Sequence, residues 1–383
     1  MRQRHRVRPL RVGIVAPPWV AVPPARYGGT EVVIDQLARG LTRAGHDVQL
    51  FATGDSTCPV RRASLYPLAL GTEADPALEL PHVRDAYRTL TNVDIVHDHT
   101  LTGPQWADEW RPDLRVVTTN HAPFTPELIA HYTRLAPRVP IIAISDAQRA
   151  SAPDVPIVEV IHHGIDVDGF PFGTGDGGYV LFLGRMSPDT GVHRAIAIAR
   201  LAGRQLVIAA KMWEARERQY FTEVVEPLLG PDAIYIGQVG GQRKLHLLAG
   251  ALALVNPIRW PEPFGLVMIE ALACGTPVLS FAEGAAPEIV EHGTTGFLCI
   301  DEADMAARLL DVPTLDRRAC RDSAARRFST QRFVDRHVAL YRRLIVGVAG
   351  CPANDRSGVR HDPTAARSDA GTLALAEPSL IRR

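Results

Sequence analysis

The sequence lacks several features that would place the protein in a specialised class. Its formal net charge is zero at pH 7, so composition gives no reason to expect a nucleic-acid partner. No apolar run approaches the length needed to cross a bilayer. The five cysteines are scattered and include no CxxC pair, which argues against a disulfide framework and for a reducing compartment. We therefore expect a cytoplasmic protein without a transmembrane segment, and peripheral contact with a membrane-borne acceptor stays open.

What the sequence does contain is a regular alternation of strand-like and helix-like segments. Its 383 residues are enough for two domains with sizeable cores. Short apolar runs typical of buried parallel strands alternate with segments of helical spacing. This alternation predicts an α/β fold with two doubly wound Rossmann-like domains. Strands are expected at 12–16, 46–53, 94–100, 115–120, 140–144, 158–161, 179–183, 206–210, 233–236, 252–256, 276–280 and 293–299.

One segment marks the boundary between the two predicted domains. Residues 168–178 are rich in glycine and aspartate and show no periodicity, as is typical of a linker. We therefore expect four parts along the chain. These are a Rossmann-like domain at 1–168, a second Rossmann-like domain at 169–330, a helix at 331–349 and a disordered tail at 350–383.

The most informative stretch is RWPEPFGLVMIEALACGTPVLS, at residues 259–280. Its apolar part predicts a helix from Phe264 to Cys274, with Pro263 in the first turn, where a missing N–H does no harm. Gly275 is expected to end this helix, and a buried strand follows.

Such a helix would present a site for an anion. The N–H groups of Phe264, Gly265 and Leu266 would be free at its N-terminus, which suits a diphosphate. Glu262 would lie just before the helix, and Glu270 about two turns inside it. The alternative is a buried structural helix with two incidental glutamates, which would need a partner for each buried charge.

A pair of glycines, Gly28 and Gly29, precedes a second predicted helix. We expect Thr30 to cap this helix and Gly45 to end it, within one βαβ unit. The pair is not part of a GxGxxG motif, so a nicotinamide cofactor is not indicated. An ordinary flexible loop remains the alternative interpretation of the glycines.

Three histidines lie at the ends of predicted strands. His121 directly follows the strand at 115–120, and ligands of open α/β sheets bind outside the carboxyl ends of strands. His97 and His99 alternate on the preceding strand and are expected to face one way. A metal site would need a third ligand, and none is evident. We therefore expect these two histidines at the rim of an acceptor cleft.

The stretch around the two glutamates resembles a known motif. Glu-Pro-Phe-Gly-Leu at 262–266, followed by Glu-Ala-Leu-Ala-Cys-Gly-Thr-Pro-Val at 270–278, is similar to the donor-binding motif of glycosyltransferase family four. That family consists of retaining, metal-independent enzymes of the GT-B fold. The resemblance covers roughly residues 10–345 and implies two domains facing across a cleft, with the acceptor on the first. It also implies a nucleotide-diphosphate sugar as substrate, with no cofactor and no metal.

The resemblance also assigns roles to individual residues. It implies that Glu262 holds the donor sugar and that Glu270 holds the ribose. His121 would touch the donor sugar, and the pair at 28–29 would lie against the diphosphate and the acceptor. Arg185, together with the helix tip, would stabilise the departing diphosphate.

The sequence departs from the family pattern at one position near the predicted phosphate site. Five residues after Arg185 the family usually has a lysine, and this chain has Thr190. Losing a cation that neutralises the leaving diphosphate should slow transfer. Lys211, at the end of the next predicted strand, is the first candidate replacement, and His193 or Arg194 would supply the charge less directly. A smaller departure lies in the linker HHGID at 162–166, where the family more often has asparagine in place of the second histidine.

Together these observations predict a retaining, metal-independent glycosyltransferase, most simply a hexosyltransferase, that acts on an unidentified acceptor (a sugar, a lipid or a small molecule). Two alternatives stay open. Thr190 favours an attenuated or non-catalytic homologue that binds a nucleotide sugar. A sugar-nucleotide epimerase of the same fold would need an acid/base pair, and none can be identified.

Overall fold

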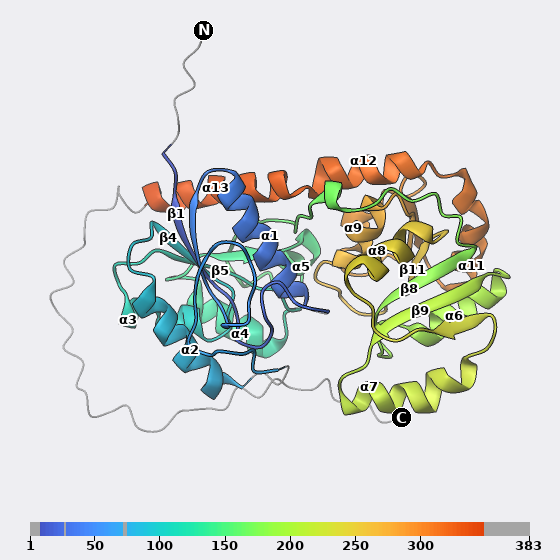
Figure 1. Cartoon of the computed structure of the whole chain (residues 1–383), viewed down its shortest axis with the longest axis horizontal. Helices are drawn as coiled ribbons and strands as arrows, with labels where there is room; N and C mark the ends of the chain where they lie inside the picture. Colours follow the sequence, from blue (N-terminus) through green and yellow to red (C-terminus); the bar gives the residue numbers. More distant parts are fainter. Residues whose placement is uncertain (1–7, 27, 72–74, 348–383) are drawn as a thin grey trace, which may run out of the picture.

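Two parallel β-sheets divide the chain into two halves (Figure 1). The computed structural model describes residues 8–26, 28–71 and 75–347. The tail predicted at 350–383 lies outside these residues. Across the described ranges, no helix combines the length and the apolar character needed to cross a bilayer.

The first sheet has seven parallel strands in the order β3-β2-β1-β4-β5-β6-β7. The order reverses beside β1, which creates the crevice where doubly wound sheets bind ligands. Its strands are β1 (Arg11–Val15), β2 (Asp47–Phe51), β3 (Arg61–Ala63), β4 (Ile95–Asp98), β5 (Val116–Thr119), β6 (Ile141–Ala143) and β7 (Ile157–Val160).

The second sheet has six strands in the order β10-β9-β8-β11-β12-β13, which repeats the same winding. Its reversal point lies between β8 and β11. The predicted fold class is therefore confirmed. Its strands are β8 (Tyr179–Arg185), β9 (Gln205–Lys211), β10 (Ala233–Tyr235), β11 (Leu254–Asn256), β12 (Val278–Phe281) and β13 (Gly296–Cys299).

Helices connect the strands and cover the sheets. In the first half these are α1 (Gly29–Arg43), α2 (Pro76–Thr89), α3 (Ala107–Trp110), α4 (Pro126–Leu135) and α5 (Asp146–Ala150). In the second half they are α6 (Val192–Leu201), α7 (Ala215–Tyr220), α8 (Gly241–Gly250), α9 (Leu266–Ala273), α10 (Ala286–Ile289), α11 (Glu302–Asp311) and α12 (Arg317–Phe328).

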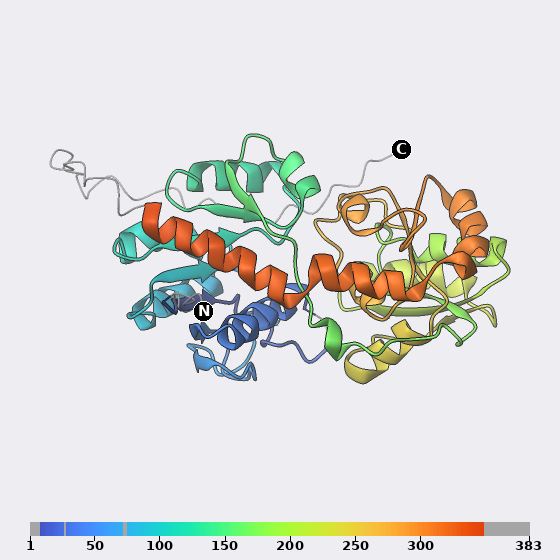
Figure 2. The same cartoon turned by 90° about the horizontal axis from the view of Figure 1, so that it is seen from above.

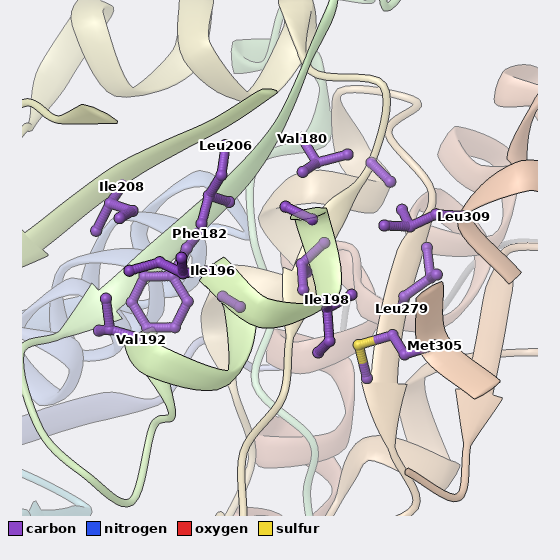
Figure 3. Close-up of a cluster of buried hydrophobic side chains, with 14 of the residues drawn as sticks. Val180, Phe182, Val192, Ile196, Ile198, Leu206, Ile208, Leu279, Met305 and Leu309 are labelled. Carbon is purple, nitrogen blue, oxygen red and sulfur yellow. The ribbon is translucent and has the colours of Figure 1, made fainter. Parts of the chain in front are cut away.

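The core of the second half shows why this alternation folds into layers (Figure 3). Val180 and Phe182 of β8 point from one face of the sheet toward Ile196 of α6, and Met305 of α11 closes the same layer. All four side chains are almost fully buried. Burying a large apolar side chain stabilises a fold by about 1.5–3 kcal/mol, so this cluster fixes the position of the carboxyl end of β8.

The last helix, α13 (Thr330–Gly347), joins the two halves. Figures 1 and 2 show α12 and α13 end to end along one side of the molecule, α12 over the second sheet and α13 over the first. The junction is tied to the linker, because Ile165 accepts from the N–H of Thr330 and donates to the carbonyl of Phe328. On α1, Gly40 permits close packing, since a Cβ there would lie 2.5 Å from Val334.

Several local predictions were wrong. Helix α9 begins at Leu266 instead of Phe264, because Gly265 has a left-handed φ of 91° and serves as N-cap. Glu270 is therefore about one turn inside the helix, not two. Helix α1 is capped by Gly28, so Thr30 lies inside it. The sequence interpretation also missed β3 and α2–α4, of which β3 and α3 are short.

Candidate active site

A cavity of about 470 Å³ lies where the carboxyl ends of the two sheets meet, a volume within the range of small-molecule sites. It is lined by all the residues predicted to be catalytic or donor-binding. From the first half these are Gly28, Gly29 and His121, and from the second half Arg185, Thr190, Lys211, Glu262, Phe264, Gly265, Leu266 and Glu270. We call this cavity the interdomain pocket.

The N-terminus of α9 points into the interdomain pocket, and of the three N–H groups predicted there the first turn of the helix keeps that of Leu266. The N–H of Phe264 interacts with the Glu262 carboxylate and so is not available to a ligand. Because the helix starts at Leu266, the unsatisfied N–H groups of its first turn are those of Leu266 and Val267, which both line the pocket. Gly265 has a φ of 91°, a left-handed conformation that L side chains rarely adopt, so glycine is favoured at the tip.

Glu262 is held at the entrance to α9 by its backbone. Its carbonyl accepts from the N–H of Ala285 at 3.0 Å, and Gly284 passes too close to the Glu262 backbone to carry a side chain. Burial raises the pKa of Glu262, while the positive charge of Arg185 and the N–H of Phe264 oppose that shift. The carboxyl group is thus fixed in position and placed near a cation.

Glu270 has a partner that the sequence interpretation missed. Nζ of Lys244, on α8, lies 2.6 Å from Oε1 of the largely buried Glu270. The sequence argument had assumed that a buried Glu270 needs a ligand as its partner. Because Lys244 is that partner, the burial of Glu270 does not by itself indicate a ligand. The sequence nevertheless contained a signal for this partner, because Lys211 and Lys244 are its only lysines. In the structure both lysines line the interdomain pocket.

The two cations at the sheet end differ in their surroundings. Arg185 and Lys211 are neighbours at the ends of β8 and β9. Nζ of Lys211 lies 3.2 Å from the buried Glu217, so much of its charge is already balanced. Arg185 lies 5.2 Å from the ring centre of Trp260, and no described carboxylate forms an ion pair with it. Arg185 is thus the stronger candidate for contact with a diphosphate.

Thr190 has a structural function in the loop after β8. Its hydroxyl lies 2.7 Å from the carbonyl oxygen of Arg185 and 3.0 Å from that of Ser187, and it can donate to either. It thereby closes the loop that carries Arg185. Thr190 therefore stabilises the loop at the pocket wall through its hydroxyl group, and it supplies no charge.

His121 belongs to a row of imidazole rings, which we call the histidine cluster: His97, His99, His121, His163 and His337. His121 and His163 line the interdomain pocket, and their rings stack at 5.5 Å. His97 and His99 face the same way, as predicted, but they do not line the pocket. They lie one layer behind His121, because α13 and its His337 cover that side of β4.

Burial keeps the histidine cluster uncharged. It lowers the pKa of His121 to about 3 and that of His337 to about 4. It also holds the pKa values of His97, His99 and His163 well below their ordinary range, with smaller contributions from the neighbouring histidines. At neutral pH the cluster is therefore a set of neutral hydrogen-bonding groups.

A separate contact fastens the two halves beside the pocket. The carboxylate of Glu288, on α10, accepts from the N–H groups of Asp146 and Ala147 at the start of α5 and contacts Nε2 of His162 at 2.7 Å. Asp146, His162 and Glu288 together place three potential ligand atoms within 4.8 Å. However, two backbone N–H dipoles already point at Glu288, which favours an interdomain clasp over a cation site.

Family models match both halves of the chain. The description "Glycosyltransferase Family 4" matches residues 27–168, and "Glycosyl transferases group 1" matches residues 172–326. A D-inositol 3-phosphate glycosyltransferase of Mycolicibacterium smegmatis is 28% identical over 87% of this chain and 91% of that protein. A glycogen synthase of Mycobacterium tuberculosis is 34% identical, over 47% of this chain and 46% of its own length.

Solved structures share the two-sheet architecture. AviGT4, described as a glycosyltransferase involved in avilamycin A biosynthesis, has a TM-score of 0.69 and 29% identity, covering 88% of this chain and 99% of its own. The sucrose-phosphate synthase of Thermosynechococcus elongatus has a TM-score of 0.74 at 20% identity, covering 88% and 100%. Anabaena HepE, solved with UDP and glucose, has a TM-score of 0.70 at 19% identity, covering 86% and 99%.

Proposed function

Because the chain belongs to glycosyltransferase family 4 and has the GT-B fold, we propose that it is a retaining transferase acting on a nucleotide-diphosphate sugar. The observation that supports this most strongly is the composition of the interdomain pocket. It brings two carboxylates, Arg185 and the N-terminus of α9 together at the reversal points of both sheets.

The donor would bind mainly to the second half. Its diphosphate would lie against Arg185 and the N–H groups of Leu266 and Val267, because a helix N-terminus and a cation both favour negative charge. Glu270 would hold the ribose, and Glu262 the transferred sugar.

The acceptor would approach from the first half. Its hydroxyl would attack the anomeric carbon on the face that the diphosphate leaves, as the bond from that carbon to the phosphate oxygen breaks. The hydroxyl proton would pass to the departing phosphate, and the new glycosidic bond would keep the original configuration. Arg185 and the helix tip would stabilise the negative charge that develops, in place of a metal ion.

A binding panel tests the donor site. The protein is heated with UDP-, GDP-, ADP- and dTDP-sugars and the free nucleotides, with EDTA present, and UDP comes first because HepE was solved with it. A ligand at about one hundred times its Kd stabilises by about 2.7 kcal/mol, which raises Tm by several degrees. We expect one nucleotide class to raise Tm, and Glu270→Ala to abolish the rise. No shift with any nucleotide would contradict the proposal.

The two lysines allow a second measurement. An amine-reactive reagent can modify only Lys211, Lys244 and the N-terminal amine. Bound nucleotide should protect Lys244, which is partly exposed and adjoins Glu270. Unchanged modification of Lys244 in saturating nucleotide would place the ligand elsewhere.

Thr190 favours a second candidate, an attenuated or non-catalytic nucleotide-sugar-binding protein, because it supplies no charge. Thr190→Lys should raise turnover if the chain is an attenuated enzyme, with Thr190→Ser as the control that keeps the hydroxyl. Binding of donor with no turnover in any variant would favour the non-catalytic alternative. Conversion of the donor sugar without acceptor would favour an epimerase.

A further inference from the structure

Two imidazole rings at the pocket wall, those of His99 and His121, are joined by a direct hydrogen bond. Nδ1 of His99 lies 2.8 Å from Nε2 of His121. His99 follows β4 and His121 follows the neighbouring strand β5, so the sheet itself sets the spacing between them. His121 lines the interdomain pocket, and His99 lies behind it.

Only one proton can occupy this nitrogen–nitrogen bond. Burial lowers the pKa of both rings, His99 well below its ordinary range and His121 to about 3, so both are neutral at neutral pH. A neutral imidazole carries one N–H donor and one acceptor nitrogen. Either His99 donates to His121 or His121 donates to His99. In the first arrangement the second proton is on Nδ1 of His121, and in the second it is on Nε2 of His99.

The far nitrogen of His99 decides between them. Nε2 of His99 is buried and has no hydrogen-bond partner among the described residues. If His121 donated, His99 would carry its proton on Nε2, and an N–H group would be buried without an acceptor. If His99 donates, Nε2 holds only a lone pair. Orphaned buried N–H groups are rarer than under-satisfied acceptors, and a buried donor without a partner is destabilising by about 1–3 kcal/mol.

The same choice determines what His121 offers the pocket. When its Nε2 accepts from His99, its proton must reside on Nδ1. Across the described ranges Nδ1 of His121 has no hydrogen-bond partner, and unlike Nε2 of His99 it is not an enclosed atom. His121 therefore has an N–H group that no described residue accepts, on a ring that lines the interdomain pocket.

A second layer holds His99 in place. The ring of His97 lies 4.0 Å from that of His99, centre to centre. His97 itself is fixed at both nitrogens, with Nδ1 2.7 Å from the hydroxyl of Tyr341 on α13 and Nε2 2.8 Å from Thr119 on β5. The cluster thus extends from α13 to the pocket wall without a charged group.

We infer that His99 is a positioning residue, whose Nδ1–H holds His121 in the Nδ1–H tautomer so that His121 presents a hydrogen-bond donor to a ligand in the pocket. The ligand atom facing His121 must then be an acceptor, such as a sugar hydroxyl oxygen or a phosphate oxygen. The functional part of this inference rests on the proposed transferase activity. The tautomer itself does not.

The tautomer can be measured directly on the full chain without substrate. Long-range 1H–15N NMR of protein labelled with 15N-histidine separates Nδ1–H from Nε2–H rings, and the loss of one signal set in His121→Gln assigns His121. We expect Nδ1–H for His121 at pH 7.5. In His99→Leu, which fills similar space without a donor, we expect His121 to move toward Nε2–H. An Nε2–H signal in the unmodified protein, or no change in His99→Leu, would overturn the inference.

Matched variants test the consequence for the reaction. The amide nitrogen of asparagine can occupy the position of a histidine Nδ1, so His99→Asn keeps a donor toward His121. Aspartate has the same shape but only accepts, so His99→Asp should force the proton onto Nε2 of His121. We expect kcat/KM to stay within about threefold in His99→Asn and to fall about tenfold in His99→Leu, equivalent to one hydrogen bond. His99→Asp should fall at least as far.

A purely structural role predicts a different pattern. It would reduce kcat/KM equally in His99→Asn and His99→Leu, in step with their loss of Tm, and that result would overturn the inference. If no donor is turned over by the unmodified chain, the proposed function fails, while the NMR comparison of the unmodified protein with His99→Leu still decides the tautomer.

Discussion

The two walls of the interdomain pocket have the same topology and opposite chemistry. Apart from the exposed Arg26, the wall from the first half offers neutral groups, chiefly the imidazoles of His121 and His163 and the backbone of the glycine pair. The wall from the second half offers charges, namely Arg185 and the Lys244–Glu270 pair. Both walls are built at the carboxyl ends of strands in the same winding order. The difference therefore comes from the few residues that follow the strands.

This difference suggests a division of labour. A charged wall favours a diphosphate, because cations and helix N-termini offset its negative charge. A wall of mostly neutral, fixed hydrogen-bonding groups suits the hydroxyls of a sugar or acceptor. Variants that change one wall only should therefore have different signatures, and the predictions below run from the largest expected effect to the smallest.

Acidification should destabilise the first half at a higher pH than the second half. Each histidine of the cluster is neutral when folded and has a lowered pKa. Its stabilising contribution is complete above the unfolded pKa of about 6.5 and is lost as pH falls toward the folded value. Each such group lowers the free energy of unfolding by about 1.4 kcal/mol per pH unit in that window, so five groups give a steep dependence.

Hydrogen exchange measured between pH 7.5 and 5 can compare the two halves. After correction for intrinsic exchange rates, β4 and β5 should lose protection at higher pH than β8 and β12. Equal loss of protection in both sheets would show that the histidine cluster does not dominate the acid response.

Removing the unpaired cation should have the next largest effect. Arg185→Ala is expected to lower kcat by about a hundredfold or more, since losing a group that stabilises developing charge typically has that size. Arg259→Ala is a matched control, because Arg259 lies near the same strand ends, packs on Phe281 and does not line the pocket. Steady-state kinetics with the donor identified by thermal shift provides the measurement. Similar losses in both variants would argue against a specific role for Arg185.

The strand ends were also where sequence reasoning was most informative. Arg185, His121 and the stretch around the two glutamates could be located because each follows a recognisable apolar run, and the structure brings them together in one pocket. Their roles stay predictions. The fold class was likewise predictable, because parallel strands buried on both faces have nearly continuous apolar sequences.

Contacts between distant segments were not predictable in this way. Lys244 meets Glu270 from another helix, and Tyr341 meets His97 from the far end of the chain. Periodicity within one segment contains no information about such pairs. The start of α9 was misplaced for a local reason, because the left-handed conformation of Gly265 outweighed the signal of the preceding proline.

Breaking the Lys244–Glu270 pair should weaken both stability and nucleotide binding. Lys244→Met leaves the Glu270 carboxylate largely buried without its cation, which is expected to lower the free energy of unfolding by about 1–2 kcal/mol, allowing for the partial exposure of Lys244. Thermal unfolding and nucleotide titration give the two readouts. The double variant Lys244→Met, Glu270→Leu removes both charges, so it should regain stability without regaining binding. Recovery of binding in the double variant would show that Glu270 does not contact the nucleotide.

The glycine pair allows the finest comparison, because its two members are adjacent in sequence and have different surroundings. A Cβ at Gly28 would lie 2.6 Å from the buried Glu31 carboxylate and 3.0 Å from Cβ of Pro24, so Gly28→Ala must displace the Glu31 carboxylate and crowd Pro24. A Cβ at Gly29 would meet only Leu266, at an ordinary 3.7 Å, across the interdomain pocket. We expect Gly28→Ala to lower the free energy of unfolding by about 1 kcal/mol or more and Gly29→Ala to change it by less than about 0.5 kcal/mol.

Gly29→Ala should instead lower the affinity for nucleotide, because the added methyl group lies at the pocket wall beside the tip of α9. Thermal unfolding with and without saturating nucleotide separates the two effects, and equal behaviour of both variants would mean that the loop adapts to either side chain.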